Sequence, residues 1–159
     1  MKLRESVRAL ILDQHDSVLL VHFDWDGLEV PGGFWANPGG GIEPGESRAE
    51  ALARELLEEV GLRPAELGPE VWTKTALFPM PGWDGQVDHI HLVRVQHFTP
   101  RPQLTRDQLL AENVREIRWW TRDELFAGDA TFSPRSLPTL IDQLVAGVLP
   151  PEPVALTGF

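Results

Sequence analysis

The chain has 159 residues, 42% of them hydrophobic, and a formal net charge of −10. This length and apolar content suffice for one domain with a substantial core, while the acidity argues against a nucleic-acid polymer as partner, because the two would repel each other. Cysteine is absent, which excludes disulfides and thiolate metal sites, and no apolar run approaches the roughly 20 residues that span a bilayer. We therefore expect a cytoplasmic protein with a small-molecule partner and no membrane association.

The first third of the chain alternates apolar segments with turns. Residues 6–13 and 18–23 are rich in branched apolar side chains and predict two strands joined by a hairpin turn. Residues 24–33 and 38–45 are rich in glycine, which predicts loops on either side of a short strand at 34–37.

The remainder predicts one long helix followed by mixed elements. In chain order these are a helix at 47–60, strands at 71–78, 87–98 and 116–120, and helices at 122–127 and 136–148. Strands interspersed with a few helices favour one domain, residues 1–149, in which helices cover a sheet. Residues 150–159 begin with Pro-Pro-Glu-Pro and predict a disordered, proline-rich tail.

The helix at 47–60 carries signals at both ends. Ser47 followed by Glu50 is a capping-box pattern, and Gly61 stands where a left-handed residue ends many helices. Six residues share one arc of the helical wheel that should face the core. They are Ala49, Leu52, Ala53, Leu56, Leu57 and Val60.

The same helix also gathers negative charge. Glu55, Glu58 and Glu59 fall within about 100° of one another on the wheel and repel one another. Glu58 and Glu59 also lie in the last turn, where the helix dipole disfavours anions. A divalent cation would relieve this conflict, since Mg²⁺ prefers carboxylate oxygen. On geometry alone, the alternative is a solvated acidic face, which is common in acidic proteins.

The order of residues from Gly40 to Leu62 strengthens the metal interpretation. Five residues separate Gly40 from Glu46 and seven separate Glu46 from Arg54, after which come Glu55-Leu56, Glu58-Glu59 and Gly61-Leu62. These nine positions over 23 residues resemble the Nudix box at every defined place. The strands around the box and the segment 118–125 extend the resemblance to the Nudix hydrolase family over residues 5–127. An earlier Pro31-Gly32-Gly33 is a decoy, because the count from Gly33 reaches Gly39 and not a glutamate.

The resemblance implies a fold of the α/β (α+β) class, an α/β/α sandwich with a mixed central sheet. It also implies hydrolysis of a nucleoside diphosphate linked to another moiety, with Mg²⁺ or Mn²⁺ as cofactor. Carried over by position, Glu58, Glu59 and the carbonyl of Gly39 would be metal ligands. Glu55 would be a further ligand or the base that activates water.

Two further residues of the box have implied supporting roles. Arg54 would hold the catalytic glutamates Glu55 and Glu59 in place, and Glu46 would pair with Arg54. The alternative for Arg54 and Glu46 is an ordinary ion pair on the helix surface, which contributes little to stability.

Pyrophosphate chemistry explains why such residues are needed. The negative charge of a pyrophosphate repels an incoming nucleophile, and cations on its oxygens neutralise that charge and orient the phosphorus. A carboxylate can then accept the proton of the attacking water. The glycine-rich loop before the helix lets the backbone approach metal and phosphate closely.

Many members of the family use one more acid outside the box, before the later tryptophan-containing strand. Glu112 is the candidate here, with Asp107 and Glu116 as alternatives. Each of the three is more often a plain surface charge in a loop or at a strand end.

The substrate is less well determined than the reaction. Phe78, Trp83, Trp25 and Trp35 are aromatic candidates for stacking on a nucleobase, although a core role is more common for each. Arg94 or Lys74 could meet a phosphate. Pro79 and Pro81 miss the register typical of ADP-ribose enzymes, and the absence of tyrosine argues against the diadenosine polyphosphate type. Nucleoside triphosphates rank first, before ADP-ribose and nucleotide sugars.

Two readings from other classes remain as alternatives. A non-catalytic nucleotide-sensing domain of the same fold would tend to have lost box glutamates, and none is lost here. A purely structural acidic domain is the other alternative. The resemblance also allows a homodimer, since members of the family are often dimers.

Overall fold

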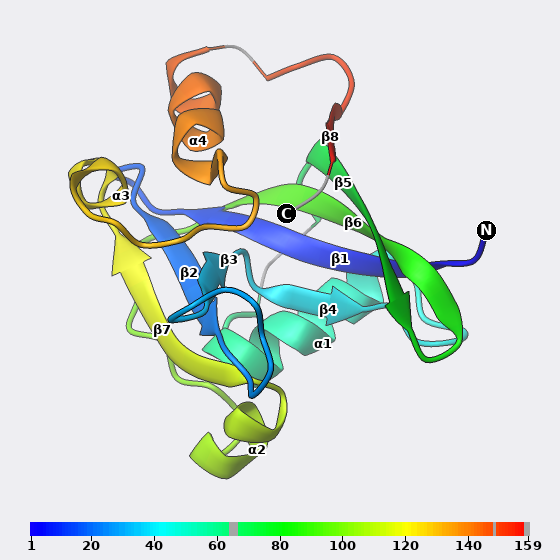
Figure 1. Ribbon diagram of the computed structural model, residues 1–159. Coiled ribbons are helices and arrows are strands. Elements are labelled where there is room, and N and C mark those ends of the chain that lie inside the picture. The colour runs from blue at the N-terminus through cyan, green and yellow to red at the C-terminus, as the bar shows by residue number, and fades with distance from the viewer. Residues whose placement is uncertain (64–66, 148, 158–159) are drawn as a thin grey trace.

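A computed structural model describes residues 1–63, 67–147 and 149–157, and its elements surround one mixed sheet (Figure 1). The strands are β1 (Leu3–Leu12), β2 (Val18–Phe23), β3 (Phe34–Ala36), β4 (Gly39–Gly41), β5 (Glu70–Met80), β6 (Trp83–Arg94), β7 (Val114–Trp120) and β8 (Val154–Thr157). The helices are α1 (Arg48–Val60), α2 (Arg106–Ala111), α3 (Arg122–Ala127) and α4 (Leu137–Ala146). None of the described helices is long and apolar enough to cross a membrane.

The sheet runs in the order β3-β2-β1-β6-β5-β8, with β4 paired to β1 and β7 paired to β2. The pairs β1–β6 and β5–β8 are parallel and the others are antiparallel. The hairpin predicted between the first two strands is present, although β1 and β2 pair only at their shared turn, at Leu12 and Val18. Beyond that point the two strands diverge.

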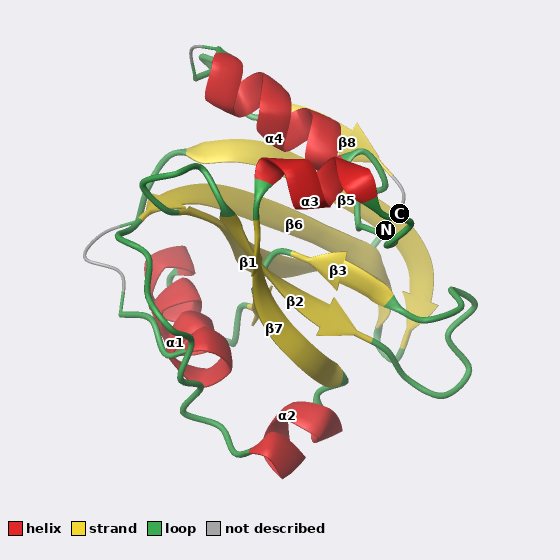
Figure 2. Cartoon of the chain, turned by 90° about the vertical axis from the view of Figure 1, so that its left-hand side faces the viewer, coloured by secondary structure: helices red, strands yellow, loops and turns green. Residues whose placement is uncertain are grey.

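Side-chain alternation along β1 divides the core into two layers. Val7, Ala9 and Ile11 pack with α1 on one face, whereas Leu10 and Leu12 pack with α3 and α4 on the other. Figure 2 shows α3 and α4 on one side of the sheet and α1 and α2 on the other. The predicted sandwich of helices around a mixed sheet is therefore confirmed.

The predicted ends of α1 are also confirmed. The Glu50 N–H donates to Ser47 Oγ at 3.1 Å and the Ser47 N–H donates to Glu50 Oε1 at 3.0 Å, which completes the capping box. Gly61 adopts φ 73° and its N–H reaches the carbonyls of Leu56 and Leu57. These contacts satisfy backbone groups that a helix end would otherwise leave unpaired.

The buried stripe of α1 differs from the predicted apolar arc. Ala49 and Ala53 are exposed, so their assignment to the core was wrong, and Leu57 is half-buried. The buried residues are Ala51, Leu52, Glu55, Leu56, Glu59 and Val60. The stripe is rotated toward the two glutamates, because α1 packs against β4 and β1 on that side. Polar residues at core-facing positions are costly unless a partner compensates them.

The segment 38–45, predicted as a loop, contains the short strand β4. Its three glycines pair antiparallel with Ser6, Val7 and Arg8 of β1. Glycine has no strand propensity of its own, so the sequence gives no local signal for this pairing. The strand forms because β2 diverges from β1 and leaves this part of the β1 edge open.

Two other elements were missed by the sequence analysis. Helix α2 begins with a capping box between Thr105 and Gln108, a pattern that could have revealed it. The disorder expected for the tail was wrong for residues 154–157, which form β8 at the edge of the sheet, parallel to β5. Leu156 packs against the core beneath α4, and the prolines that exclude a helix all precede the strand and do not interrupt it.

Deleting residues 154–159 should lower the free energy of unfolding by about 1–2 kcal/mol, because the half-buried Leu156 loses its contacts. At this chain length the expected change is a fall of a few degrees in Tm, measured by thermal melting. Activity should persist, since β5 and β6 separate β8 from β1. Leu156→Ser should reproduce most of the loss and Val154→Ser, at an exposed position, very little; an unchanged Tm after deletion would refute the role of β8.

Candidate metal centre

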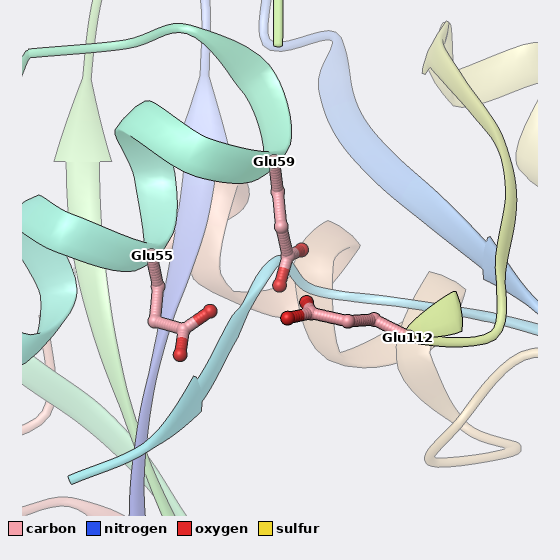
Figure 3. A group of neighbouring side chains, drawn as sticks. All are labelled: Glu55, Glu59 and Glu112. Atoms are coloured by element: carbon pink, nitrogen blue, oxygen red, sulfur yellow. The ribbon is translucent and has the colours of Figure 1, made fainter. Parts of the chain in front are cut away.

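Three carboxylates from two separate helices meet beside α1. Glu55 and Glu59 lie one turn apart on α1 and are 8% and 3% exposed. Glu112, the C-cap of α2, joins them, and one carboxylate oxygen from each of the three lies within 4.8 Å of the others (Figure 3). Of the three acids considered outside the box, the structure brings Glu112 to the cluster, whereas Asp107 and Glu116 are exposed elsewhere on α2 and β7.

The donor set of this cluster suits a hard divalent cation. Glu59 Oε2 is buried and has no hydrogen-bond partner among the described residues. Burial raises the pKa of Glu59 well above its usual value, and the neighbouring Glu55 raises it further, while Arg8 opposes the rise. A buried carboxylate without a partner is strongly unfavourable, and an ion bound between these oxygens would remove the penalty.

Glu112 and Glu58 share this environment from the rim of the cluster. The pKa of Glu112 is raised by partial burial and then by the charge of Glu55. The pKa of Glu58 is raised by the same two causes, in the same order. Glu58 is not one of the three converging acids, and its Oε2 lies 3.8 Å from Arg54 Nη1. Its ligation of a metal therefore remains a prediction.

Arg54 is held by a dense set of contacts. Its Nε and Nη2 donate to the two carboxylate oxygens of Glu46 at 2.7 and 2.9 Å, a bidentate pair. Its Nη1 donates to Glu55 Oε1 at 2.8 Å, and Nη2 also donates to the Gly41 carbonyl at 3.1 Å. The hydrogen bonds from Arg54 lower the pKa of Glu46 to about 2. Arg54 thus connects the box glutamates to β4 and orients Glu55.

The glycines of β4 let the backbone pass directly beside the carboxylates. Gly39 adopts φ 145°, and a Cβ there would lie 2.2 Å from the Val7 carbonyl oxygen. A Cβ on Gly40 would lie 2.5 Å from Glu55 Oε1. Gly39 therefore has no room for a side chain, and a side chain at Gly40 would have to displace the Glu55 carboxylate. The carbonyl of Gly39 remains a predicted metal ligand.

Gly40→Ala should lower kcat by about 10- to 100-fold, a range typical of disturbing groups that orient metal ligands. The new methyl group would displace the Glu55 carboxylate, whereas Gly40 lies outside the left-handed region and its backbone needs no change. The measurement is the initial rate at saturating Mg²⁺. Gly128→Ala is the matched control, because the nearest atom to its Cβ is 4.0 Å away. Equal rates for the two variants would contradict the close packing of β4 on Glu55.

The residues predicted to bind substrate lie in two places outside the acidic cluster. Phe78 and Trp83 flank the β5–β6 turn, 42% and 36% exposed, and Lys2 Nζ lies 4.8 Å from the centre of the Trp83 ring. Arg94 forms an ion pair with Asp16 at 2.7 Å, beside the β1–β2 turn. Their roles in binding remain predictions.

The other residues considered for substrate are divided between core and surface. Trp35 is buried and meets Trp120 edge-on, as expected of a core side chain. Trp25 is 39% exposed. Lys74 Nζ donates to Ser133 Oγ at 2.9 Å, and burial lowers its pKa.

The sequence analysis overlooked a polar network on the sheet. Asp88 of β6 accepts hydrogen bonds from Arg8, Ser6 and Gln86 and is 6% exposed. The signal was present in the sequence as charged residues inside otherwise apolar strands, at positions that should face the core.

Comparison with known proteins supports these observations. A family model described as the NUDIX domain matches residues 2–140. Nucleoside triphosphatase NudI of an Enterobacter species is 31% identical over 116 residues, which are 72% of this chain and 80% of that protein. RNA pyrophosphohydrolase of a Sulfurovum species is 30% identical over 118 residues, which are 70% and 73% of the two chains.

A solved structure shares the fold. The NUDIX domain of Shewanella oneidensis NrtR, complexed with ADP ribose, matches with a TM-score of 0.64 at 20% identity, over 89% of this chain and 88% of that one. Together with a family match over most of the sequence and relatives named as phosphohydrolases, this likeness confirms the resemblance seen in the box. The chain belongs to the NUDIX domain family and is an enzyme of the Nudix pyrophosphohydrolase type.

Proposed function

We propose that this enzyme hydrolyses a pyrophosphate bond in a nucleoside diphosphate linked to another moiety, with Mg²⁺ or Mn²⁺ held by Glu55, Glu59 and Glu112. Glu58 and the Gly39 carbonyl complete the proposed ligand set. The single observation that supports this most is the convergence of three carboxylates within 4.8 Å around a buried glutamate oxygen that has no other partner among the described residues.

The metal would supply positive charge that offsets the charge of the pyrophosphate and orients it for attack. The residues of the chain divide the remaining work. Glu55, oriented by Arg54 at 2.8 Å, accepts the proton of the attacking water. Glu59 and Glu112 supply the other two carboxylates of the cluster. Arg54 also donates to the Gly41 carbonyl of β4, and so fixes the position of Glu55 relative to that strand.

Nucleoside triphosphates are the proposed first substrate class, followed by ADP-ribose and nucleotide sugars. One relative is named a nucleoside triphosphatase, and a solved domain of the same fold binds ADP ribose. Another relative is named an RNA pyrophosphohydrolase, but the net charge of −10 disfavours a polymeric substrate here.

The test is a panel of nucleoside triphosphates, ADP-ribose, nucleotide sugars, dinucleotides and 5′-triphosphorylated RNA, each incubated with and without Mg²⁺. We expect Mg²⁺-dependent release of pyrophosphate or nucleotide from a small substrate. Glu59→Gln is the negative control, because a contaminating hydrolase would survive that substitution. An intact panel together with measurable nucleotide binding would favour the non-catalytic sensing alternative, and cleavage of the RNA alone would overturn the ranking of substrates.

A further inference from the structure

Arg8 of β1 is the second arginine beside the acidic cluster, and it lies among polar groups on the sheet. Its Nε lies 3.2 Å from Asp88 Oδ1, and its Nη1 donates to the Asn37 carbonyl at 2.9 Å. Asp88 is itself held by Ser6 Oγ and by Gln86 Nε2, the latter at 2.8 Å. Two of the three nitrogens of the Arg8 guanidinium are therefore held, Nε by a buried carboxylate and Nη1 by a backbone carbonyl.

The two arginines near the cluster differ in the donors that they have free. All three nitrogens of Arg54 make hydrogen bonds, to Glu46, Glu55 and Gly41. Nη2 of Arg8 has no partner among the described residues, and it is not one of the buried unpartnered atoms. The Arg8 side chain is 20% exposed. Nη2 of Arg8 is thus an accessible donor for a ligand, whereas each nitrogen of Arg54 already has a partner.

Electrostatic interactions link the Arg8 side chain to the acidic cluster. The pKa of Arg8 is raised although burial lowers it, because Asp88, Glu59 and Glu55 all favour its charged form. Two further cations lie on this network. Lys74 Nζ is directed to Ser133, and its charge acts on Asp88 and not on the two glutamates. Arg4 Nη1 donates to Gln86 at 3.4 Å, and its guanidinium lies against Gly41.

Geometry also places Arg8 beside β4, because a Cβ on Gly39 would lie 2.8 Å from Arg8 Cγ, while a Cβ on the next residue, Gly40, would lie 2.5 Å from Glu55 Oε1. Arg8 thus combines a free donor with a position one strand away from Glu55.

We propose that Arg8, oriented by Asp88, donates to a non-bridging oxygen of the substrate's diphosphate beside the cluster of Glu55, Glu59 and Glu112. This inference rests on the proposed function, since it assigns a further binding residue to the same reaction. An arginine suits the position because its planar guanidinium can bind a carboxylate through Nε and still donate to a phosphate from Nη2. A diphosphate held between the metal and Arg8 would have its charge offset from two sides.

The test compares Arg8→Gln, Arg8→Lys and the control Arg122→Gln, which removes an exposed arginine paired with Asp142 on α4. Arg8→Gln should raise KM by roughly 10- to 100-fold, the range for one charge-assisted hydrogen bond. Arg8→Lys should recover part of this loss, because the charge remains but the fork does not. Arg122→Gln should behave as the unmodified enzyme.

A second readout separates phosphate binding from a structural role. Inorganic pyrophosphate with Mg²⁺ should raise the Tm of the unmodified enzyme and of Arg122→Gln, and should raise that of Arg8→Gln much less. Mn²⁺ affinity should be unchanged or increased in Arg8→Gln, since a cation near the ion has been removed. A lower Mn²⁺ affinity would mean that Arg8 acts on the metal site instead, and would overturn the proposal.

Two further comparisons distinguish a folding defect of Arg8→Gln from a loss of binding, and the role of Arg8 from the proposed function. If Arg8→Gln leaves Asp88 unpaired and does not fold, the double variant Arg8→Gln/Asp88→Asn removes both charges and allows the same measurements. An active enzyme whose folded Arg8 variants keep the original KM and pyrophosphate response refutes the role of Arg8 alone. An enzyme without hydrolytic activity whose pyrophosphate response still depends on Arg8 refutes the proposed function and leaves the binding role supported.

Discussion

Glu59→Gln should reduce kcat by about a thousandfold or more at saturating Mg²⁺. Glu59 is the most deeply buried acid of the cluster, and its Oε2 has no hydrogen-bond partner among the described residues, as expected of a proposed metal ligand. A neutral amide would weaken charge stabilisation of the transition state by several kcal/mol, and each 1.36 kcal/mol is about tenfold in rate. The measurement is the initial rate with the best substrate of the panel.

Glu50→Gln is the matched control for this prediction. It removes the same charge from the same helix, and glutamine can still accept the Ser47 N–H in the capping box. Its kcat should be close to that of the unmodified enzyme. Near-normal activity of Glu59→Gln, or an equal loss in both variants, would contradict the assignment of Glu59 as a metal ligand.

Glu59→Gln should also stabilise the protein when metal is removed. The pKa of Glu59 is raised in the fold, so its stabilising contribution is present below about pH 4.5 and is lost as pH rises through the raised value. With a chelator, the Tm of the unmodified protein should fall relative to Glu59→Gln between pH 5 and pH 8, and Mg²⁺ should reverse the difference. If the difference in Tm between the two proteins does not change with pH, the buried charge of Glu59 does not destabilise the fold.

Arg54→Gln should have the second-largest effect, with a fall in kcat of about 100-fold and a loss of about 1.5–3 kcal/mol in the free energy of unfolding. The substitution removes the bidentate contact with Glu46 and the bond that orients Glu55, and Arg54 is only 26% exposed. Kinetics at saturating Mg²⁺ and chemical denaturation measure the two effects.

Arg48→Gln is the control that distinguishes an effect on the acidic cluster from a general effect on α1. Arg48 is also on α1 and also pairs with a carboxylate of another element, Glu70 at 2.9 Å, but it makes no contact with the cluster. It should lose some stability and keep its kcat. If both arginine variants lose activity equally, the effect of Arg54 is a general loosening of α1 and not the orientation of Glu55.

Local signals account for the features that the sequence predicted well. The boundaries of α1 depend on Ser47, Glu50 and Gly61, whose hydrogen bonds are all within the helix or its caps. Glu55 and Glu59 share a face because of helical spacing alone. The same reasoning cannot decide among Asp107, Glu112 and Glu116, because the choice depends on where α2 ends in space. Glu112 reaches the cluster as the C-cap of that helix.

The features that were missed depend on contacts between distant segments. The glycines of β4 become a strand only because the edge of β1 is open beside them. Ala49 and Ala53 were assigned to the core by hydrophobicity, yet α1 turns its glutamates inward, toward β4 and α2. Arg8 and Asp88 are 80 residues apart and meet through the parallel pairing of β1 and β6. Sequence periodicity can place Arg8 and Asp88 on core-facing positions of their strands, but it does not predict which distant segments pair.

The central claim is that Glu55, Glu59 and Glu112 bind the divalent cation that hydrolysis requires. The most direct test is a crystal grown with Mn²⁺, in which anomalous scattering locates the ion. We expect a peak between these three carboxylates, within about 2.0–2.6 Å of their oxygens, and no such peak for Glu59→Gln. A peak elsewhere, or an empty cluster in crystals of an enzyme that is active under the same conditions, would contradict it.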